Sequence, residues 1–135
     1  MMRIGFIGLG NVGSKLASNL LNNNFDLMVF DKDKEVTDQF QKKGSKVALS
    51  IEQLVSNNEI LITCLPSPEA CKEVIESSKG IVAYLKENQI WMEMSTTDED
   101  QLKKHASLIE SKKAIALEAP VSGGCHRAAT GNISI

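Results

Sequence analysis

The sequence predicts an α/β fold, in which a doubly wound, mainly parallel sheet carries helices on both faces. Short apolar runs rich in β-branched residues alternate with amphipathic stretches along the whole chain, and no low-complexity linker interrupts them. Strands and helices that alternate in this way form parallel sheets through right-handed crossovers. The 135 residues suffice for one domain with a buried core, and they leave room for six strands and at most the start of a seventh.

Six short apolar runs are expected to form the strands. They cover residues 3–7, 26–30, 46–49, 59–64, 90–94 and 114–118. The third run is the weakest. The fourth has little polar alternation, as expected for a strand that is covered on both faces.

The stretches between these runs predict the helices. They cover residues 11–23, 33–43, 51–57, 69–77, 81–87 and 98–112. In the first helix Val12, Leu16 and Leu20 recur at i, i+4 and i+8, so they share one apolar face. Gly44 is expected to end the second helix.

Composition and charge argue against several classes of protein. Hydrophobic residues make up 42% of the chain and charged residues 24%, as in globular proteins. The net charge of -2 gives no reason to expect a nucleic-acid or membrane partner. The chain enters a strand at Arg3, which leaves no room for a signal or transit peptide. We therefore expect an intracellular protein, of the cytoplasm or the mitochondrial matrix.

Three cysteines are present, Cys64, Cys71 and Cys125. Their number is odd and no two have CxxC spacing, so neither a disulfide framework nor a metal site is predicted. We expect small packed thiols in a reducing compartment.

A glycine-rich turn follows the first strand. Gly8, Gly10 and Gly13 have the spacing G-x-G-x-x-G, and the third glycine lies inside the next helix. Gly8 allows the tight turn, Gly10 lets the backbone approach a pyrophosphate, and Gly13 lets the helix pack on the strand. The helix N-terminus offers N–H groups to the phosphates. The motif predicts a Rossmann-type dinucleotide site. Its expected contacts are Gly8, Leu9, Gly10, Asn11, Val12 and Gly13.

Asp31 ends the second strand, 18 residues beyond Gly13. A carboxylate here accepts hydrogen bonds from the ribose 2′-hydroxyl of NAD and repels the 2′-phosphate of NADP. Lys32, the next residue, could soften that repulsion, so NAD is expected and NADP stays open. Asp31 could instead cap the following helix.

Ligands of open α/β sheets lie beyond the carboxyl ends of the strands. After the fourth strand, Leu65 and Pro66 are either an apolar support for the cofactor or part of a helix start, with Ser67 as the cap and Pro68 in the first helical position.

After the fifth strand, Thr96 either contacts the nicotinamide end or forms a capping box with Glu99. After the sixth comes A-P-V-S-G-G, residues 119–124, a plain turn or a ligand-binding loop. Its place at the same sheet edge favours the ligand.

Together these motifs resemble the β-hydroxyacid dehydrogenase family, which includes the 3-hydroxyisobutyrate dehydrogenases. I-G-F-I-G-L-G-N-V-G, C-L-P-S, S-T-T, E-A-P-V-S-G-G and A-A-T-G-N-I-S occur in this order over essentially the whole chain. The resemblance implies reversible NAD(P)-dependent oxidation of a 3-hydroxy acid to a semialdehyde or keto acid. It implies a cofactor site at Gly8, Gly10, Gly13, Asp31, Leu65, Pro66 and Thr96.

The resemblance also implies a substrate site. Ser122, Gly123 and Gly124 would hold the substrate carboxylate, because a hydroxyl and glycine N–H groups in a tight turn form an anion-binding concavity. The family's catalytic lysine lies in a G-x-x-G-x-x-x-K segment after the nucleotide domain, which would fall beyond Ile135. We therefore expect no catalytic residue in residues 1–135, and a homo-oligomer formed mainly by a further helical domain.

The chain departs from the family pattern at a few positions. Glu93 and Glu118 stand where aspartate is usual, and His126 and Arg127 where a small residue or glycine is usual. Arg127 either selects a more acidic substrate or is a solvated surface residue. His105, in the middle of a lysine-rich helix, is expected to be exposed.

Two other interpretations remain open. 6-Phosphogluconate dehydrogenase shares the S-G-G loop, but it tends to carry an Asn-Arg-Thr-like NADP-binding stretch where this chain has Phe30, Asp31 and Lys32. A non-catalytic dinucleotide-binding or interaction module would lack the lysine-bearing domain.

Overall fold

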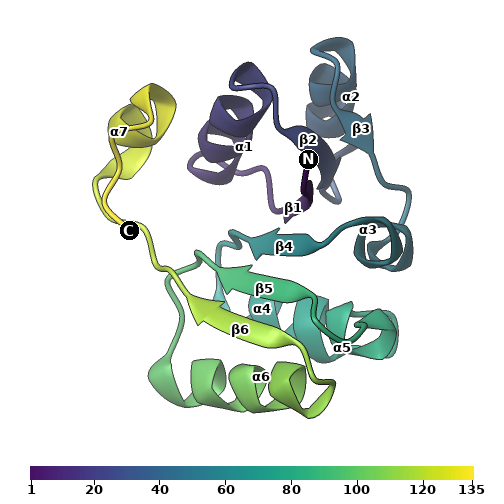
Figure 1. Cartoon of the computed structure of the whole chain (residues 1–135). Coiled ribbons are helices and arrows are strands. Elements are labelled where there is room, and N and C mark those ends of the chain that lie inside the picture. The colour runs from purple at the N-terminus through teal and green to yellow at the C-terminus, as the bar shows by residue number, and fades with distance from the viewer.

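The computed structural model describes residues 1–135 and contains one six-stranded sheet (Figure 1). The strands are β1 (Arg3–Ile7), β2 (Asp26–Phe30), β3 (Lys46–Val47), β4 (Ile60–Thr63), β5 (Ile90–Glu93) and β6 (Ile115–Glu118). Their order is β3-β2-β1-β4-β5-β6, and every neighbouring pair is parallel. The strand order therefore reverses between β1 and β4, and the predicted doubly wound fold is confirmed.

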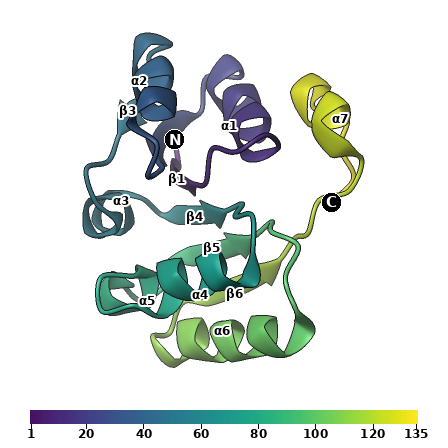
Figure 2. The same cartoon turned by 180° about the vertical axis from the view of Figure 1, so that it is seen from behind.

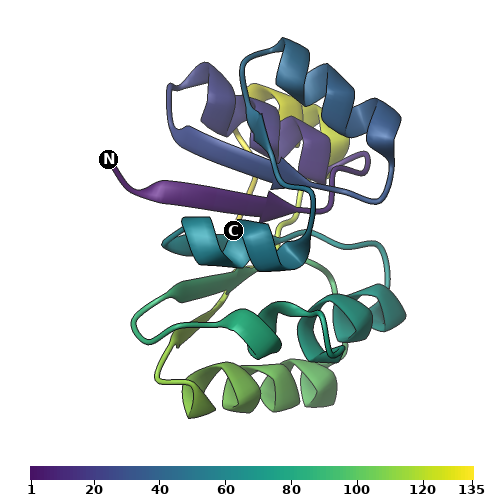
Figure 3. The ribbon, with the colours of Figure 1, turned by 90° about the vertical axis from the view of Figure 1, so that its right-hand side faces the viewer.

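Seven helices connect and cover the strands. They are α1 (Gly13–Asn22), α2 (Lys34–Lys42), α3 (Ile51–Asn57), α4 (Pro68–Glu76), α5 (Ile81–Tyr84), α6 (Glu99–Ser111) and α7 (Gly124–Thr130). Figure 1 and the reverse view in Figure 2 show α1, α2 and α7 grouped apart from α4, α5 and α6, and Figure 3 shows the same grouping from the side. None of these helices combines the length and apolar character needed to span a bilayer.

Each face of the sheet has its own apolar core. On one face Phe6 and Val29 pack with Ala17 of α1 and Phe40 of α2. The other core centres on Trp91, and α3 to α6 supply most of its remaining side chains. The two cores are separate because successive residues of a strand point to opposite faces.

Side-chain caps begin α2, α3, α4 and α6, whereas α1, α5 and α7 have none. Ser67 Oγ accepts from the Ala70 N–H at 3.1 Å and Pro68 begins α4, as expected. Of the two alternatives for Thr96, the capping box with Glu99 is wrong. Asp98 is the N-cap of α6, because its carboxylate accepts from the backbone N–H groups two and three residues further on.

The expectation that His105 is exposed is also wrong, because its ring is fully buried. The ring lies on the inner face of α6, and its Nε2 is 2.8 Å from Glu76 Oε1 of α4. Its plane meets the Trp91 indole edge-on at 76°. The neighbouring lysines point outward, so a lysine-rich stretch of helix still buries the residue that falls on its inner face.

We predict that Glu76 stabilises the fold through its charge. A hydrogen bond from Lys104, and then one from His105, lowers the pKa of Glu76 against the opposing effect of partial burial. A lowered pKa means that the ionised form favours the folded state, so this stabilisation is complete above the ordinary pKa of 4.5 and is lost as the pH falls through the lowered value.

Glu76→Gln should therefore lower the Tm at pH 7 by about 3 °C, and the difference from the native chain should shrink below pH 4.5. Thermal unfolding followed by circular dichroism across pH 3 to about 8 measures this. Glu110→Gln, at an exposed position of α6 without an ion pair, is the matched control. A loss of Tm that is equal at all pH values would contradict a charge effect.

Candidate functional site: a groove across the carboxyl ends of the strands

A cavity of about 880 Å³ lies over the carboxyl ends of β1, β2, β4 and β5. This is the point where the strand order reverses, which is where open α/β sheets bind their ligands. Most of the residues predicted to contact a cofactor line the cavity. They are Gly8, Gly10, Asn11, Val12, Gly13, Asp31, Leu65, Pro66 and Thr96. We call this cavity the main groove.

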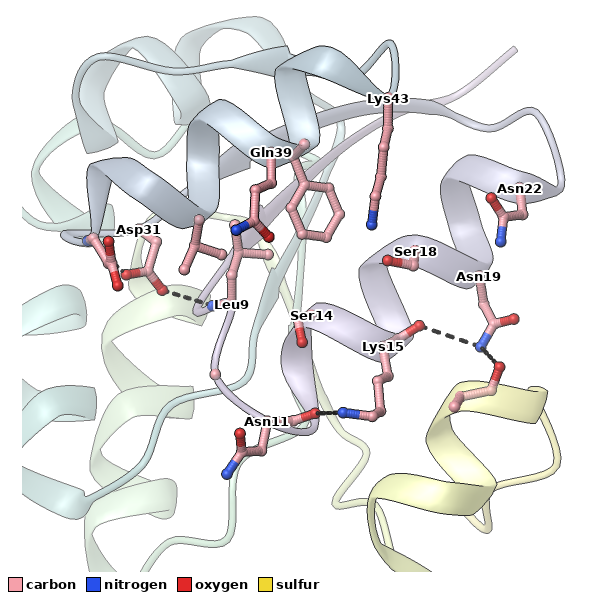
Figure 4. Close-up of a pocket in the computed structure, with 15 residues that line it drawn as sticks. Leu9, Asn11, Ser14, Lys15, Ser18, Asn19, Asn22, Asp31, Gln39 and Lys43 are labelled. Carbon is pink, nitrogen blue, oxygen red and sulfur yellow. Dashed lines mark hydrogen bonds between the residues drawn. The ribbon is translucent and has the colours of Figure 1, made fainter.

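Leu9 is the predicted contact that does not line the main groove. Its side chain is only 3% exposed and packs in the core between the sheet and α1. Its backbone N–H donates to Asp31 Oδ2 at 2.7 Å (Figure 4). Leu9 therefore anchors the glycine turn to the core, while its neighbours Gly8 and Gly10 line the groove.

Two glycines of the turn are required by close packing. Gly8 has a φ of 99°, and a Cβ on it would collide with the Cys64 carbonyl oxygen at the end of β4. A Cβ on Gly13 would collide with the Gly8 carbonyl oxygen. Gly10 differs, because a Cβ there would meet no atom within 4 Å. Packing within the chain therefore does not explain the glycine at position 10.

Asp31 joins the glycine turn to the end of β2. Its Oδ2 accepts from the Leu9 N–H, and its Oδ1 accepts from the Asp33 N–H at 2.8 Å. The N-cap of α2 is Asp33, which accepts from the Glu35 N–H, so Asp31 is not the helix cap. Each carboxylate oxygen can accept a second hydrogen bond, which leaves Asp31 able to bind a ribose hydroxyl.

A buried carboxylate lies beneath the other end of the groove. Glu93, at the end of β5, is 1% exposed, and its Oε1 accepts from Thr63 Oγ1 at 3.0 Å and from the Ser95 N–H at 2.8 Å. Trp91 Nε1 donates to the same threonine hydroxyl at 3.0 Å. Ser95 Oγ in turn accepts from the Leu65 N–H at 2.7 Å. This network ties the turn after β4 to the turn after β5.

Glu93 was not among the site residues predicted from the sequence, where it stood out only as a glutamate in place of the family's usual aspartate. The available signal was an acidic residue at the end of an apolar strand, directly before the residues that face the cavity. Its second oxygen, Oε2, is buried without a hydrogen-bond partner.

Two thiols lie close to this carboxylate. Cys64 lines the main groove and Cys71 is fully buried on α4. Burial, and next the negative charge of Glu93, raise the pKa of each thiol to about 11. Both thiols are therefore protonated at neutral pH and are poor nucleophiles.

The A-P-V-S-G-G stretch leads away from the main groove. Val121 lines the groove, whereas Ser122, Gly123 and Gly124 are exposed and do not. Ser122 and Ser134 exchange two backbone hydrogen bonds, of 2.8 and 2.9 Å. Gly123 and Gly124 have φ values of 125° and 72°, which suit glycine, and they lead into α7.

The helix α7 was not predicted, and it packs against α1. Asn19 of α1 donates from Nδ2 to the Ala128 carbonyl oxygen near the end of α7 (Figure 4). His126 and Arg127 are both exposed on this helix. No acidic side chain pairs with Arg127, which agrees with a solvated surface residue.

A second, polar cavity of about 560 Å³ lies between α1 and α2, on the other side of the glycine turn (Figure 4). Ser14 and Ser18 of α1 face Gln39 of α2 and Lys43, the C-cap of that helix, across it. Gly10, Asn11 and Asp31 border both cavities, so the turn forms a wall between them.

The fold and the main groove define a dinucleotide-binding domain of the kind found in oxidoreductases. Residues 3–135 match the family model of the NAD binding domain of 6-phosphogluconate dehydrogenase. The chain therefore belongs to this family of domains, as an N-terminal domain of the β-hydroxyacid dehydrogenase type.

Two curated proteins and one solved structure are similar to this chain over most of its length. The mitochondrial 3-hydroxyisobutyrate dehydrogenase of Mus musculus is 34% identical over 131 residues, which are 97% of this chain and 39% of that protein. The cytokine-like nuclear factor N-PAC of Pongo abelii is 34% identical over 90% of this chain and 22% of its own length. Psf3, solved in complex with NADP+ and 2-OPP, has a TM-score of 0.93 at 27% identity, and covers 96% of this chain and 46% of that one.

These comparisons confirm the resemblance that the motifs indicated and a nicotinamide dinucleotide as the ligand class of the domain. This chain spans about two fifths of the length of the curated dehydrogenases that it matches.

We predict that Glu93 holds the two turns together. Glu93→Ala would leave the Thr63 hydroxyl and the Ser95 N–H without their acceptor and would open a cavity, so we expect a loss of about 2 to 4 kcal/mol in the free energy of unfolding. Urea denaturation measures it. Glu118→Ala is the matched control, because Glu118 pairs in register with Glu93 on β6 but is exposed. Equal losses in the two variants would contradict this role.

Proposed function

We propose that residues 1–135 are the cofactor-binding part of an NAD(P)-dependent dehydrogenase of the 3-hydroxyisobutyrate type. The observation that carries the proposal is the glycine turn, in which Gly8 and Gly13 are required by packing while Gly10 is open toward the main groove. A bound dinucleotide would supply the hydride acceptor. The chain would bind, orient and shield it.

The residues of the main groove suit such a cofactor. The pyrophosphate would lie against Gly10 and the first turn of α1, where backbone N–H groups and the helix dipole favour an anion. Asp31 would accept from the adenosine ribose, which favours NAD over NADP. Leu65 and Pro66 would form an apolar support for the nicotinamide end of the cofactor, with Thr96 beside it.

The substrate is proposed to be a small 3-hydroxy acid, oxidised reversibly to a semialdehyde or keto acid. Ser122, Gly123 and Gly124 would bind its carboxylate, since all three are exposed and the two glycines form a turn of positive φ. The proton-transferring lysine would come from a segment beyond residue 135. Residues 1–135 alone are therefore expected to bind the dinucleotide weakly and to turn over no substrate.

The same proposal leads to expectations about the oligomeric state, location and partners of the whole protein. We expect a homo-oligomer whose contacts lie mainly outside this domain. We also expect an intracellular location, in the cytoplasm or the mitochondrial matrix, with no nucleic-acid or membrane partner.

A second candidate function is a non-catalytic dinucleotide-binding or interaction module. It is favoured by the relative N-PAC, which is named as a nuclear factor and has the same identity, 34%, as the mouse dehydrogenase. A 6-phosphogluconate dehydrogenase type of activity is the other alternative, and the match to that enzyme's domain family supports it.

Gly10→Ala should separate cofactor binding from folding. The added methyl group meets no atom of the chain within 4 Å, so the urea midpoint should change little, whereas contact with the pyrophosphate should be blocked. We expect dinucleotide affinity to fall by about tenfold or more, measured by calorimetry with NAD and NADP. Gly44→Ala, at a positive-φ helix end away from the groove, is the control: it should lose stability and keep its affinity.

The full-length protein should oxidise 3-hydroxy acids. A panel of such acids, assayed with NAD and with NADP by absorbance of the reduced nicotinamide, tests the activity. 6-Phosphogluconate belongs in the panel as the alternative substrate. Turnover of a 3-hydroxy acid that is lost when the lysine of the expected segment becomes alanine would support the proposal. Cofactor binding without turnover of any member would favour the non-catalytic module.

A further inference from the structure

One ion pair lies across the wall of the main groove beside Asp31. Lys32, two residues after the end of β2, places its Nζ 3.1 and 3.0 Å from the two carboxylate oxygens of Glu73 on α4. Both residues line the groove, together with Asp31. The pair thus joins two segments that are 41 residues apart, at the end of the groove where Asp31 would hold the adenosine ribose.

The pairing decides which charges face a ligand at this end. Lys32 alone would offer a mobile ammonium group to a phosphate beside the ribose 2′-position. Bound to both oxygens of Glu73, its charge is offset and two of its three N–H donors are engaged. A 2′-phosphate would then meet two carboxylates, those of Asp31 and Glu73, and one lysine that is already paired.

We propose that Glu73 is a specificity-determining residue, which disfavours NADP by holding Lys32 away from the 2′-phosphate. This inference rests on the proposed function, because it presumes that the main groove binds a nicotinamide dinucleotide. NAD carries no 2′-phosphate, so Glu73 affects its binding little.

The side chains involved are well exposed, 75% for Lys32 and 61% for Glu73. Exposed pairs contribute little to folding stability, so their removal leaves the fold intact. The pair should affect ligand binding more than folding, because a bound adenosine would displace water from the space between Asp31 and the pair.

The test is the selectivity of the 135-residue chain, expressed as the ratio of the Kd for NADP to the Kd for NAD from calorimetry. Glu73→Gln keeps the shape of the side chain and releases Lys32. We expect the ratio to fall by about fivefold, through tighter NADP binding, with the Kd for NAD changed less than about twofold. The effect should shrink as salt is raised, because the charges are exposed to solvent.

Two further variants identify the source of the effect. Asp38→Asn breaks a similar exposed pair, Lys34 with Asp38 at 3.0 Å on α2, away from the groove, and should leave the ratio unchanged. In a Lys32→Ala background, Glu73→Gln should no longer lower the ratio, because no ammonium group is released. Lys79 also lines the groove, and a fall that persists without Lys32 would assign the effect to Lys79 or to the charge of Glu73 itself and overturn the inference.

The outcomes separate this inference from the proposed function. If the native chain binds neither dinucleotide while circular dichroism shows it folded, the cofactor proposal fails and the inference fails with it. If both dinucleotides bind and the ratio is the same in the native chain and in Glu73→Gln, the inference fails alone.

Discussion

The close approach of α1 to the ends of β1 and β4 is the constraint on which the rest of the structure depends. Gly8 has no room for a Cβ because of the Cys64 carbonyl oxygen, and Gly13 has none because of the Gly8 carbonyl oxygen. This packing directs the start of α1 at the point where the strand order reverses. It also leaves Gly10 facing open space, so the same turn that closes the core on one side presents bare backbone to the groove on the other.

Two carboxylates help to keep the groove in shape. Asp31, which is half-buried, bonds the glycine turn to the end of β2, and Glu93, which is buried, bonds the turns that follow β4 and β5. A buried carboxylate is costly unless it accepts hydrogen bonds, so Glu93 in particular has one well-defined place. The result is a cavity whose walls come from four strands and yet are held by only a few side-chain contacts.

The charged side chains at the surface of the groove are exposed and are not part of this hydrogen-bonded framework. Lys32 and Glu73 contribute little to the fold, and the sheet would form without them. Under the proposed role of Glu73, this pair would act on the choice of dinucleotide, whereas Asp31 would both hold the glycine turn and contact the ribose.

The amino-acid sequence was enough to predict the fold class, the six strands along the chain and most of the residues that line the groove. Strand and helix periodicities are local, and the G-x-G-x-x-G turn with Asp31 has a geometry that a linear motif can specify. Element ends moved by one to three residues, as with the first helix, which begins at Gly13 rather than at residue 11. Such ends depend on caps that compete within a few residues, as Asp98 does with Thr96.

Only the tertiary structure decided what lies between elements far apart in the chain. The burial of His105 requires the contact of α6 with α4, and the network of Glu93 requires β4 beside β5. The pair of Lys32 with Glu73 likewise joins the turn after β2 to α4. None of these contacts can be read from a periodicity or a motif in the sequence. Each one joins residues that are 29 to 41 positions apart in the chain and that only the fold brings close together.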